Sequence, residues 1–110
     1  MAVKIVTNGS CVTAYIEGEI DHHNAPALRE SIDSAIEKSR PKTLKLDFGG
    51  VSFMDSSGVG LVMGRYKNAA RYGGEVEVLN LSRSAERIMK LSALENFVRF
   101  KKSAEAGRMN

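Results

Sequence analysis

The stretch Val51-Ser52-Phe53-Met54-Asp55-Ser56-Ser57-Gly58-Val59-Gly60 decides the fold, because it runs from the end of a strand into the start of a helix. The N–H groups of a first helical turn have no partner within the helix, and the helix dipole is positive at that end. An oxygen or an anion at Asp55, Ser56 or Ser57 is therefore favoured. The pattern fits both an ordinary helix cap and a site for an added phosphate.

The spacing of apolar residues predicts the elements on either side of this stretch. Strands are expected at 3–6, 12–16, 44–48, 75–79 and 97–100. The Asn8-Gly9 step favours a tight hairpin between the first two strands. Helices are expected to begin after Asn24, at the Asp55 turn and after Ser82, since all three residues are good N-caps. Gly49-Gly50 is expected to lie beyond the third strand and to lead into the quoted stretch.

The connections between the later strands predict the topology. Strands joined by short helical crossovers are parallel neighbours, and the crossovers are right-handed. If each crossover steps the same way across the sheet, the helices cover one face and leave the other partly wet, as the alternating strands also indicate. The predicted fold class is therefore α/β, with a single mixed sheet: an N-terminal antiparallel hairpin, then parallel strands, with helices mainly on one face.

Length and composition predict one domain spanning residues 1–110. The composition, 43% hydrophobic and 26% charged residues, is enough to form a core. The length of 110 residues is too short for a catalytic domain plus a regulatory domain. No apolar run approaches the ~18 residues of a membrane span, and the N-terminus lacks the features of a secretory signal. A cytoplasmic protein without membrane contact is expected, and the sole cysteine, Cys11, suits a reducing compartment. The segment 101–110 is expected to fray.

The second helix is expected to present two different sides. The core stripe is predicted to be Val59, Val62, Met63, Tyr66 and Ala70. The opposite side is predicted to be a shallow outer strip with an exposed leucine and arginine: Gly60, Leu61, Gly64, Arg65 and Asn68. A glycine inside a helix costs about 0.5–1 kcal/mol relative to alanine, so stability does not explain the strip. It would admit either a partner's backbone or a loop of the same domain. The last helix is predicted to carry Ala85, Ile88, Met89 and Leu91.

Several chemistries are excluded or weakened by the residues. The net charge is +3, but the basic residues are scattered along the chain, and Lys101-Lys102 is the only tight basic pair. No nucleic-acid partner is therefore expected. No metal-ligand spacing surrounds the adjacent histidines, and no glycine-rich nucleotide motif is complete, so no metal and no cofactor are expected. A small serine hydrolase remains an alternative, because His22 or His23 could approach Ser56 at the carboxyl ends of parallel strands. The strained Gly-x-Ser-x-Gly elbow of such enzymes is missing.

Four segments of the sequence carry a family resemblance. They are Gly18-Glu19-Ile20-Asp21-His22-His23, Ser52–Gly60, Gly64-Arg65-Tyr66-Lys67 and Gly73-Gly74. These residues resemble the anti-sigma factor antagonist family, the STAS domains, and within it the sporulation members most. An antagonist of another stress or signalling pathway is the alternative within the same fold.

The resemblance implies a partner switch without enzymatic activity. Family members bind a serine-kinase anti-sigma factor and so release its sigma factor; the kinase then phosphorylates the antagonist, and a PP2C-type phosphatase restores it. The family phosphoserine corresponds to Ser56, and the free chain is expected to be monomeric. The residues expected to bind the partner are Asp21, His22, His23, Asp55, Ser57, Gly58, Gly60, Leu61, Gly64, Arg65 and Asn68.

Overall fold

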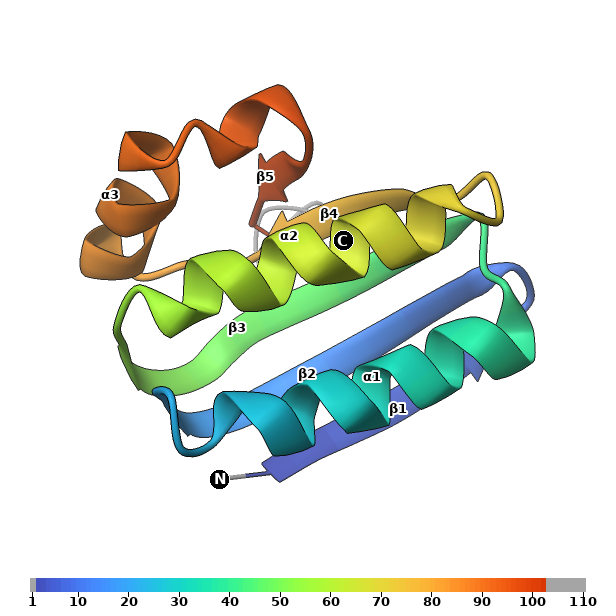
Figure 1. Ribbon diagram of the computed structural model, residues 1–110, viewed down its shortest axis with the longest axis horizontal. Helices are drawn as coiled ribbons and strands as arrows, with labels where there is room; N and C mark the ends of the chain where they lie inside the picture. Colours follow the sequence, from blue (N-terminus) through green and yellow to red (C-terminus); the bar gives the residue numbers. More distant parts are fainter. Residues whose placement is uncertain (1, 103–110) are drawn as a thin grey trace, which may run out of the picture.

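A computed structural model describes residues 2–102 as one five-stranded sheet with three α-helices and a short 3-10 helix (Figure 1). The strands are β1 (Ala2–Asn8), β2 (Cys11–Ile20), β3 (Thr43–Met54), β4 (Glu75–Leu79) and β5 (Arg99–Lys101). The helices are α1 (Ala25–Ser39), α2 (Ser57–Ala70), α3 (Arg83–Leu91) and the 3-10 helix η1 (Leu94–Asn96).

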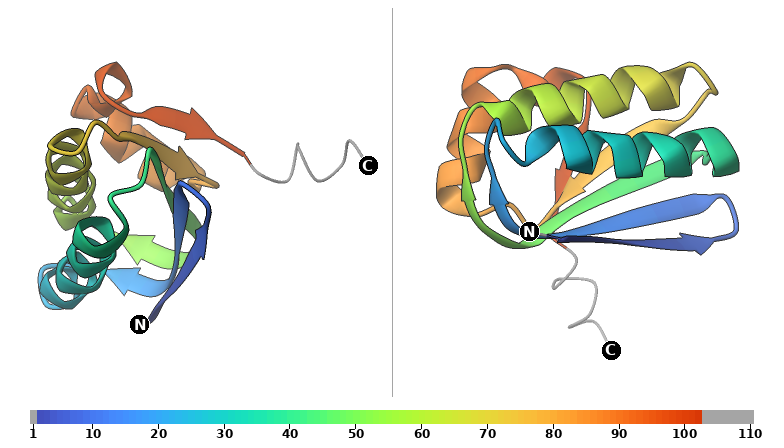
Figure 2. Two further views of the ribbon diagram at one scale, coloured as in Figure 1. Left: turned by 90° about the vertical axis from the view of Figure 1, so that its right-hand side faces the viewer. Right: turned by 60° about the horizontal axis from the view of Figure 1, so that its bottom comes forward.

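The strand order in the sheet follows the sequence, β1-β2-β3-β4-β5. β1 and β2 are antiparallel and joined by the tight turn Gly9-Ser10, in which Gly9 has a φ of 62°. Asn8 is the last residue of β1 and pairs with Cys11. All later neighbours are parallel. Figures 1 and 2 show α1 and α2 side by side on one face of the sheet. The predicted fold class is confirmed.

The core lies between this face and the helices. Alternate residues of β2 and β3, such as Val12 and Leu44, are fully buried and meet Ile32 of α1 in one apolar cluster. On the opposite face of the sheet, Tyr15 is 44% exposed and Glu17 is exposed. The alternation read from the sequence therefore corresponds to a dry face and a wet face.

β3 is longer than predicted and continues through Gly49-Gly50 to Met54. Gly50 pairs with Glu17 next to a shift in the β2–β3 register. A Cβ on Gly50 would lie 3.0 Å from the carbonyl oxygen of Ile16, so the close approach of the two strands requires glycine here. The glycine pair lets the strand continue past an irregularity, where the sequence pattern indicated that it stopped.

The predicted outer strip of α2 is wrong for three of its five residues. Leu61, Arg65 and Asn68 are only 3%, 5% and 8% exposed, because α1 lies alongside α2 and covers that side. The sequence analysis left open that a loop of the same domain crosses this side of α2. A segment of the same domain does cover it, but that segment is the helix α1. Gly60 and Gly64 do stay open: a Cβ on either would meet no atom within 4 Å.

The C-terminal part of the described chain agrees with the prediction at its start and differs later. Ser82 caps α3 as expected, its hydroxyl accepting the Ala85 amide at 3.1 Å. Leu91, the last residue of α3, belongs to the helix as predicted and is 82% exposed. β5 includes Lys101, which pairs with Leu79 although it was expected to fray. The rest of the predicted frayed segment, from residue 103 on, lies outside the described residues.

Candidate functional site

The turn between β3 and α2 is fixed to the end of β2. The Asp55 amide donates to the Ile20 carbonyl at 3.1 Å, which continues the contact between the two parallel strands past their last residues. The loop that follows β2, with Asp21, therefore lies next to the Asp55 turn. Because carboxyl ends of parallel strands share one edge, two motifs that are far apart in sequence form one surface.

Asp55 caps the start of α2. Its Oδ1 accepts the Ser57 amide at 2.7 Å. This hydrogen bond, followed by one from the Ser57 side chain and a weaker attraction from His22, lowers the pKa of Asp55 below its ordinary value of 3.8. The carboxylate is thus charged at neutral pH and stabilises the positive end of the helix.

The two serines of the turn have different surroundings. Ser57 is half-buried and bound to Asp55, whereas Ser56 is exposed. Ser56 occupies the N-cap position with φ −66° and ψ −12°, and its side chain makes no capping hydrogen bond. Across residues 2–102, the hydroxyl of Ser56 has no protein hydrogen-bond partner. Local sequence rules could not choose between these serines, but the structure leaves only Ser56 both exposed and unbonded.

Gly58 is needed for the packing under this turn. It is buried, and a Cβ there would overlap the Sδ atom of Met54 and approach its Cγ to 2.6 Å. Met54 closes the core at the end of β3 with 7% exposure. Gly58 thus allows the first turn of α2 to sit directly on the strand that precedes it.

The loop after β2 has an analogous cap. Asp21 Oδ1 accepts the amides of His23 and Asn24, each at 3.0 Å. Asn24 stands at the N-cap position of α1 as predicted, but its side chain donates to the Glu19 carbonyl at 3.2 Å and caps nothing. The rings of His22 and His23 are exposed, with centroids 4.4 Å apart. Asp21 therefore shapes the loop, and the histidines are left on its surface.

A polar contact joins α1 to α2 in the covered strip. Asp33 Oδ1 lies 2.8 Å from Arg65 Nε and accepts the Asn68 side-chain amide, also at 2.8 Å. Burial lowers the pKa of Arg65, an effect that the charge of Asp33 opposes. Arg65 and Asn68 therefore hold the two helices together, a role that the sequence did not indicate because Asp33 lies 35 residues before Asn68.

A shallow hollow lies between the N-terminal halves of α1 and α2. Its lining residues are His22, Ala25, Pro26 and Arg29 on one side and Ser57, Gly60, Leu61 and Arg65 on the other. Five of the eleven predicted partner-binding residues line this hollow. The other six do not line it: Asp21, His23, Asp55, Gly58, Gly64 and Asn68. Arg29 was missed by the sequence analysis; the only available signal was its position four residues before Asp33 on α1.

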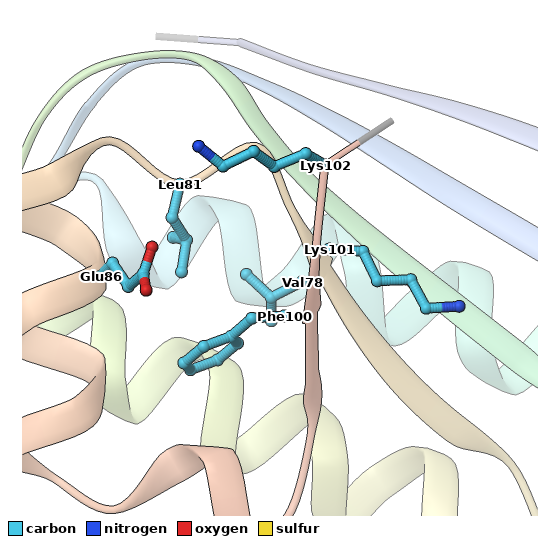
Figure 3. Close-up of a pocket in the computed structure, with 6 residues that line it drawn as sticks. All are labelled: Val78, Leu81, Glu86, Phe100, Lys101 and Lys102. Carbon is cyan, nitrogen blue, oxygen red and sulfur yellow. The ribbon is translucent and has the colours of Figure 1, made fainter. Parts of the chain in front are cut away.

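Other parts of the described chain offer less chemistry. Figure 3 shows a second hollow, whose lining contains no serine, cysteine or histidine; its lining residues are Val78, Leu81, Glu86, Phe100, Lys101 and Lys102. Within residues 2–102 no hydrogen bond connects a serine hydroxyl to a histidine, and no three side chains of metal-binding type cluster. No helix in the same range combines the length and apolar character needed to cross a bilayer.

Comparison with known proteins identifies the family. A model of the STAS domain matches residues 2–107. The chain belongs to the STAS domain family. This STAS domain is 35% identical over 79 residues to the anti-sigma F factor antagonist of Paenibacillus polymyxa, covering 72% of this chain and 68% of the relative. It is 30% identical over 105 residues to the anti-sigma-B factor antagonist of Bacillus subtilis (strain 168), covering 96% and 94%.

Solved structures of similar proteins exist in two chemical states. The anti-sigma factor antagonist SpoIIAA in its unphosphorylated form matches this STAS domain with a TM-score of 0.80 and 32% identity, covering 96% of this chain and 92% of that one. The Bacillus cell fate determinant SpoIIAA in the phosphorylated form matches with a TM-score of 0.74 and 32% identity, covering 99% and 100%. Both states of that relative are therefore compatible with the fold described above.

Proposed function

We propose that this STAS domain is a cytoplasmic anti-sigma factor antagonist that binds a serine-kinase anti-sigma factor and is switched off by phosphorylation of Ser56. The observation that carries the proposal is the hydroxyl of Ser56, exposed and unbonded at the first turn of α2 beside the charged Asp55. The similarity to antagonists of both the sigma F and the sigma-B type supports it. A PP2C-type phosphatase would restore the unmodified state, and the chain itself would catalyse nothing.

The proposed partner surface consists of three parts. They are the loop at Asp21–His23, the turn at Asp55–Ser57 and the open glycines Gly60 and Gly64 of α2. Gly58, which the sequence placed on this surface, is buried against Met54 and supports the turn from beneath. Without side chains at the two glycines, a partner's backbone can approach the helix closely. Leu61 and Asn68 act beneath this surface, because α1 covers them.

The position of Ser56 explains how one phosphate would release the partner without unfolding the domain. A phosphoserine adds about −1.5 to −2 charge at neutral pH. The N-terminus of α2 tolerates an anion, so the helix persists. A partner that fits the unmodified turn would have to desolvate this new charge next to Asp55, and the complex weakens.

The test is a phosphorylation assay with purified anti-sigma factor kinases of the sigma F and sigma-B types and ATP. We expect one phosphate on the parent chain, none on Ser56→Ala, and one on Ser57→Ala, which serves as the matched control. The variants should keep the parental circular dichroism spectrum. A phosphate mapped to Ser57, or no complex with either kinase, would contradict the proposal.

A further inference from the structure

The hollow between α1 and α2 has a one-sided charge. Two arginines, Arg29 and Arg65, and one histidine, His22, line it, and none of its lining residues is acidic. Ser57, in the first turn of α2, lines the same space, and its amide is already bound by the Asp55 carboxylate. The charge of the lining therefore comes from the arginine side and favours an anionic group over an uncharged or cationic one.

Arg65 gives this charge a fixed position. The residue is only 5% exposed, and its Nη1 has no hydrogen-bond partner among the described residues. Its counter-ion, Asp33, uses a single oxygen both for Arg65 and for the Asn68 amide. The Nη1 atom is itself buried, and the guanidinium charge is compensated by Asp33 from one side only.

Arg29 provides the exposed half of the same site. Its side chain is exposed on α1, and its like charge adds to the burial that lowers the pKa of Arg65. Two cations thus act on each other across the hollow without an acid between them in its lining. A carboxylate placed there would relieve that repulsion and accept hydrogen bonds from planar guanidinium groups.

We propose that this hollow is an anion subsite that receives a carboxylate side chain of the anti-sigma factor. The inference rests on the proposed function, because the hollow adjoins the proposed partner surface through Ser57 and Gly60. It also supplies a reason for release: a phosphate on Ser56 stands one residue from Ser57, neutralises the positive potential of the hollow and repels the partner's carboxylate.

The first experiment uses the free protein and small anions. Inorganic phosphate and acetate are titrated into the ¹⁵N-labelled chain, and the amide signals of Ser57 and Gly60 are followed by NMR. We expect saturable shifts in the parent. The affinity for the anion should fall at least fivefold in Arg29→Gln and stay at the parental value in Lys38→Gln, which removes the same charge at the far end of α1. Arg65 is not substituted, because its loss would leave Asp33 without its ion-pair partner. The absence of saturable shifts in the parent would overturn the subsite.

The second experiment measures the complex with the anti-sigma factor by calorimetry. We expect Arg29→Gln to weaken binding about tenfold, Lys38→Gln to leave it unchanged, and inorganic phosphate to compete with the partner. If phosphate binds the hollow but Arg29→Gln binds the anti-sigma factor with the affinity of the parent, a carboxylate of the anti-sigma factor does not occupy the hollow. If the parent forms no complex while phosphate still binds, the proposed function fails and the hollow is a site for a free anion instead.

Discussion

Two turns of this molecule use a serine in the same position for different purposes. Ser56 and Ser82 each stand at the N-cap of a helix that follows a parallel strand. Ser82 has an extended backbone, with ψ 166°, and its hydroxyl accepts the Ala85 amide at 3.1 Å. Ser56 has a helical backbone, with ψ −12°, and makes no such bond, because Asp55 caps the helix from the preceding position.

The difference teaches how a fold keeps a hydroxyl free. A serine that caps its own helix is occupied, and any modification of it would cost the helix its cap. Transferring the cap to Asp55 leaves Ser56 exposed at the same favourable helix end. The α3 turn is therefore the internal control for the α2 turn, and the first three of the four predictions below use it in this way.

The largest effect is expected from charge placed at the α2 turn. Ser56→Asp should weaken the complex with the anti-sigma factor by about tenfold or more, since each 1.4 kcal/mol of lost interaction is about a factor of ten. Ser82→Asp is the control, because it adds the same charge at the α3 turn, where aspartate caps as well as serine. Titration calorimetry measures both. Equal affinities for Ser56→Asp and the parent would show that size, not charge, governs release, and a much lower melting temperature would mean that the switch refolds the domain.

The second effect concerns packing at the same helix position. Gly58→Ala should lower the free energy of unfolding by about 1–2 kcal/mol, because the new methyl group displaces Met54 in a packed core. Ser84→Ala, at the corresponding position of α3, is exposed and should change it by less than about 0.5 kcal/mol. Urea unfolding of the two variants gives the comparison. A parental stability for Gly58→Ala would mean that Met54 rotates away freely.

The third effect separates the occupied hydroxyl from the free one. Ser82→Ala should cost about 1 kcal/mol of stability through the lost cap, a shift of roughly 4–8 °C in melting temperature. Ser56→Ala should leave the melting temperature within about 2 °C of the parent, because Ser56 caps nothing. Thermal unfolding followed by circular dichroism measures both variants. Similar losses in the two would remove the distinction drawn between the turns.

The smallest effect is a pH dependence at Asp55. Its pKa in the folded chain lies below 3.8, so its charged form stabilises the fold above that pH, and the contribution disappears as the pH falls through the lowered value. Asp55→Asn should therefore be less stable than the parent at neutral pH and approach it at low pH. Glu17→Gln, exposed on the open sheet face, corrects for the change in net charge. If the difference in stability between the parent and Asp55→Asn stays constant with pH, the charge of Asp55 is not the cause of that difference.

The sequence was sufficient for those parts of the fold that depend on local patterns. Alternation predicted the strands, and good N-cap residues predicted where the helices begin. It failed at Gly49-Gly50, because the same glycines that end a strand elsewhere also permit a register shift inside one, and the deciding neighbour, Glu17, is far away in sequence.

The site was predicted in part, for a similar reason. The motif with Asp55 and Ser56 is contiguous, so its place at the start of α2 could be predicted from the sequence. The buried sides of α2 were predicted wrongly, because a helix that packs on both a sheet and a second helix buries more than one stripe. Such a helix can also bury polar residues if a neighbouring side chain satisfies their hydrogen bonds. Arg65 has such a partner in Asp33, and no local pattern identifies it.

The strand order β1-β2-β3-β4-β5 never reverses along the described sheet. In parallel α/β proteins, a crevice for a small ligand opens where the order reverses and successive crossovers diverge to opposite faces. The carboxyl edge of this sheet lacks that divergence, so under the proposed function ATP has to reach Ser56 inside a cleft that belongs to the partner. Under this proposal the domain is a substrate: it presents the Ser56 hydroxyl, and the catalytic groups belong to its partner proteins.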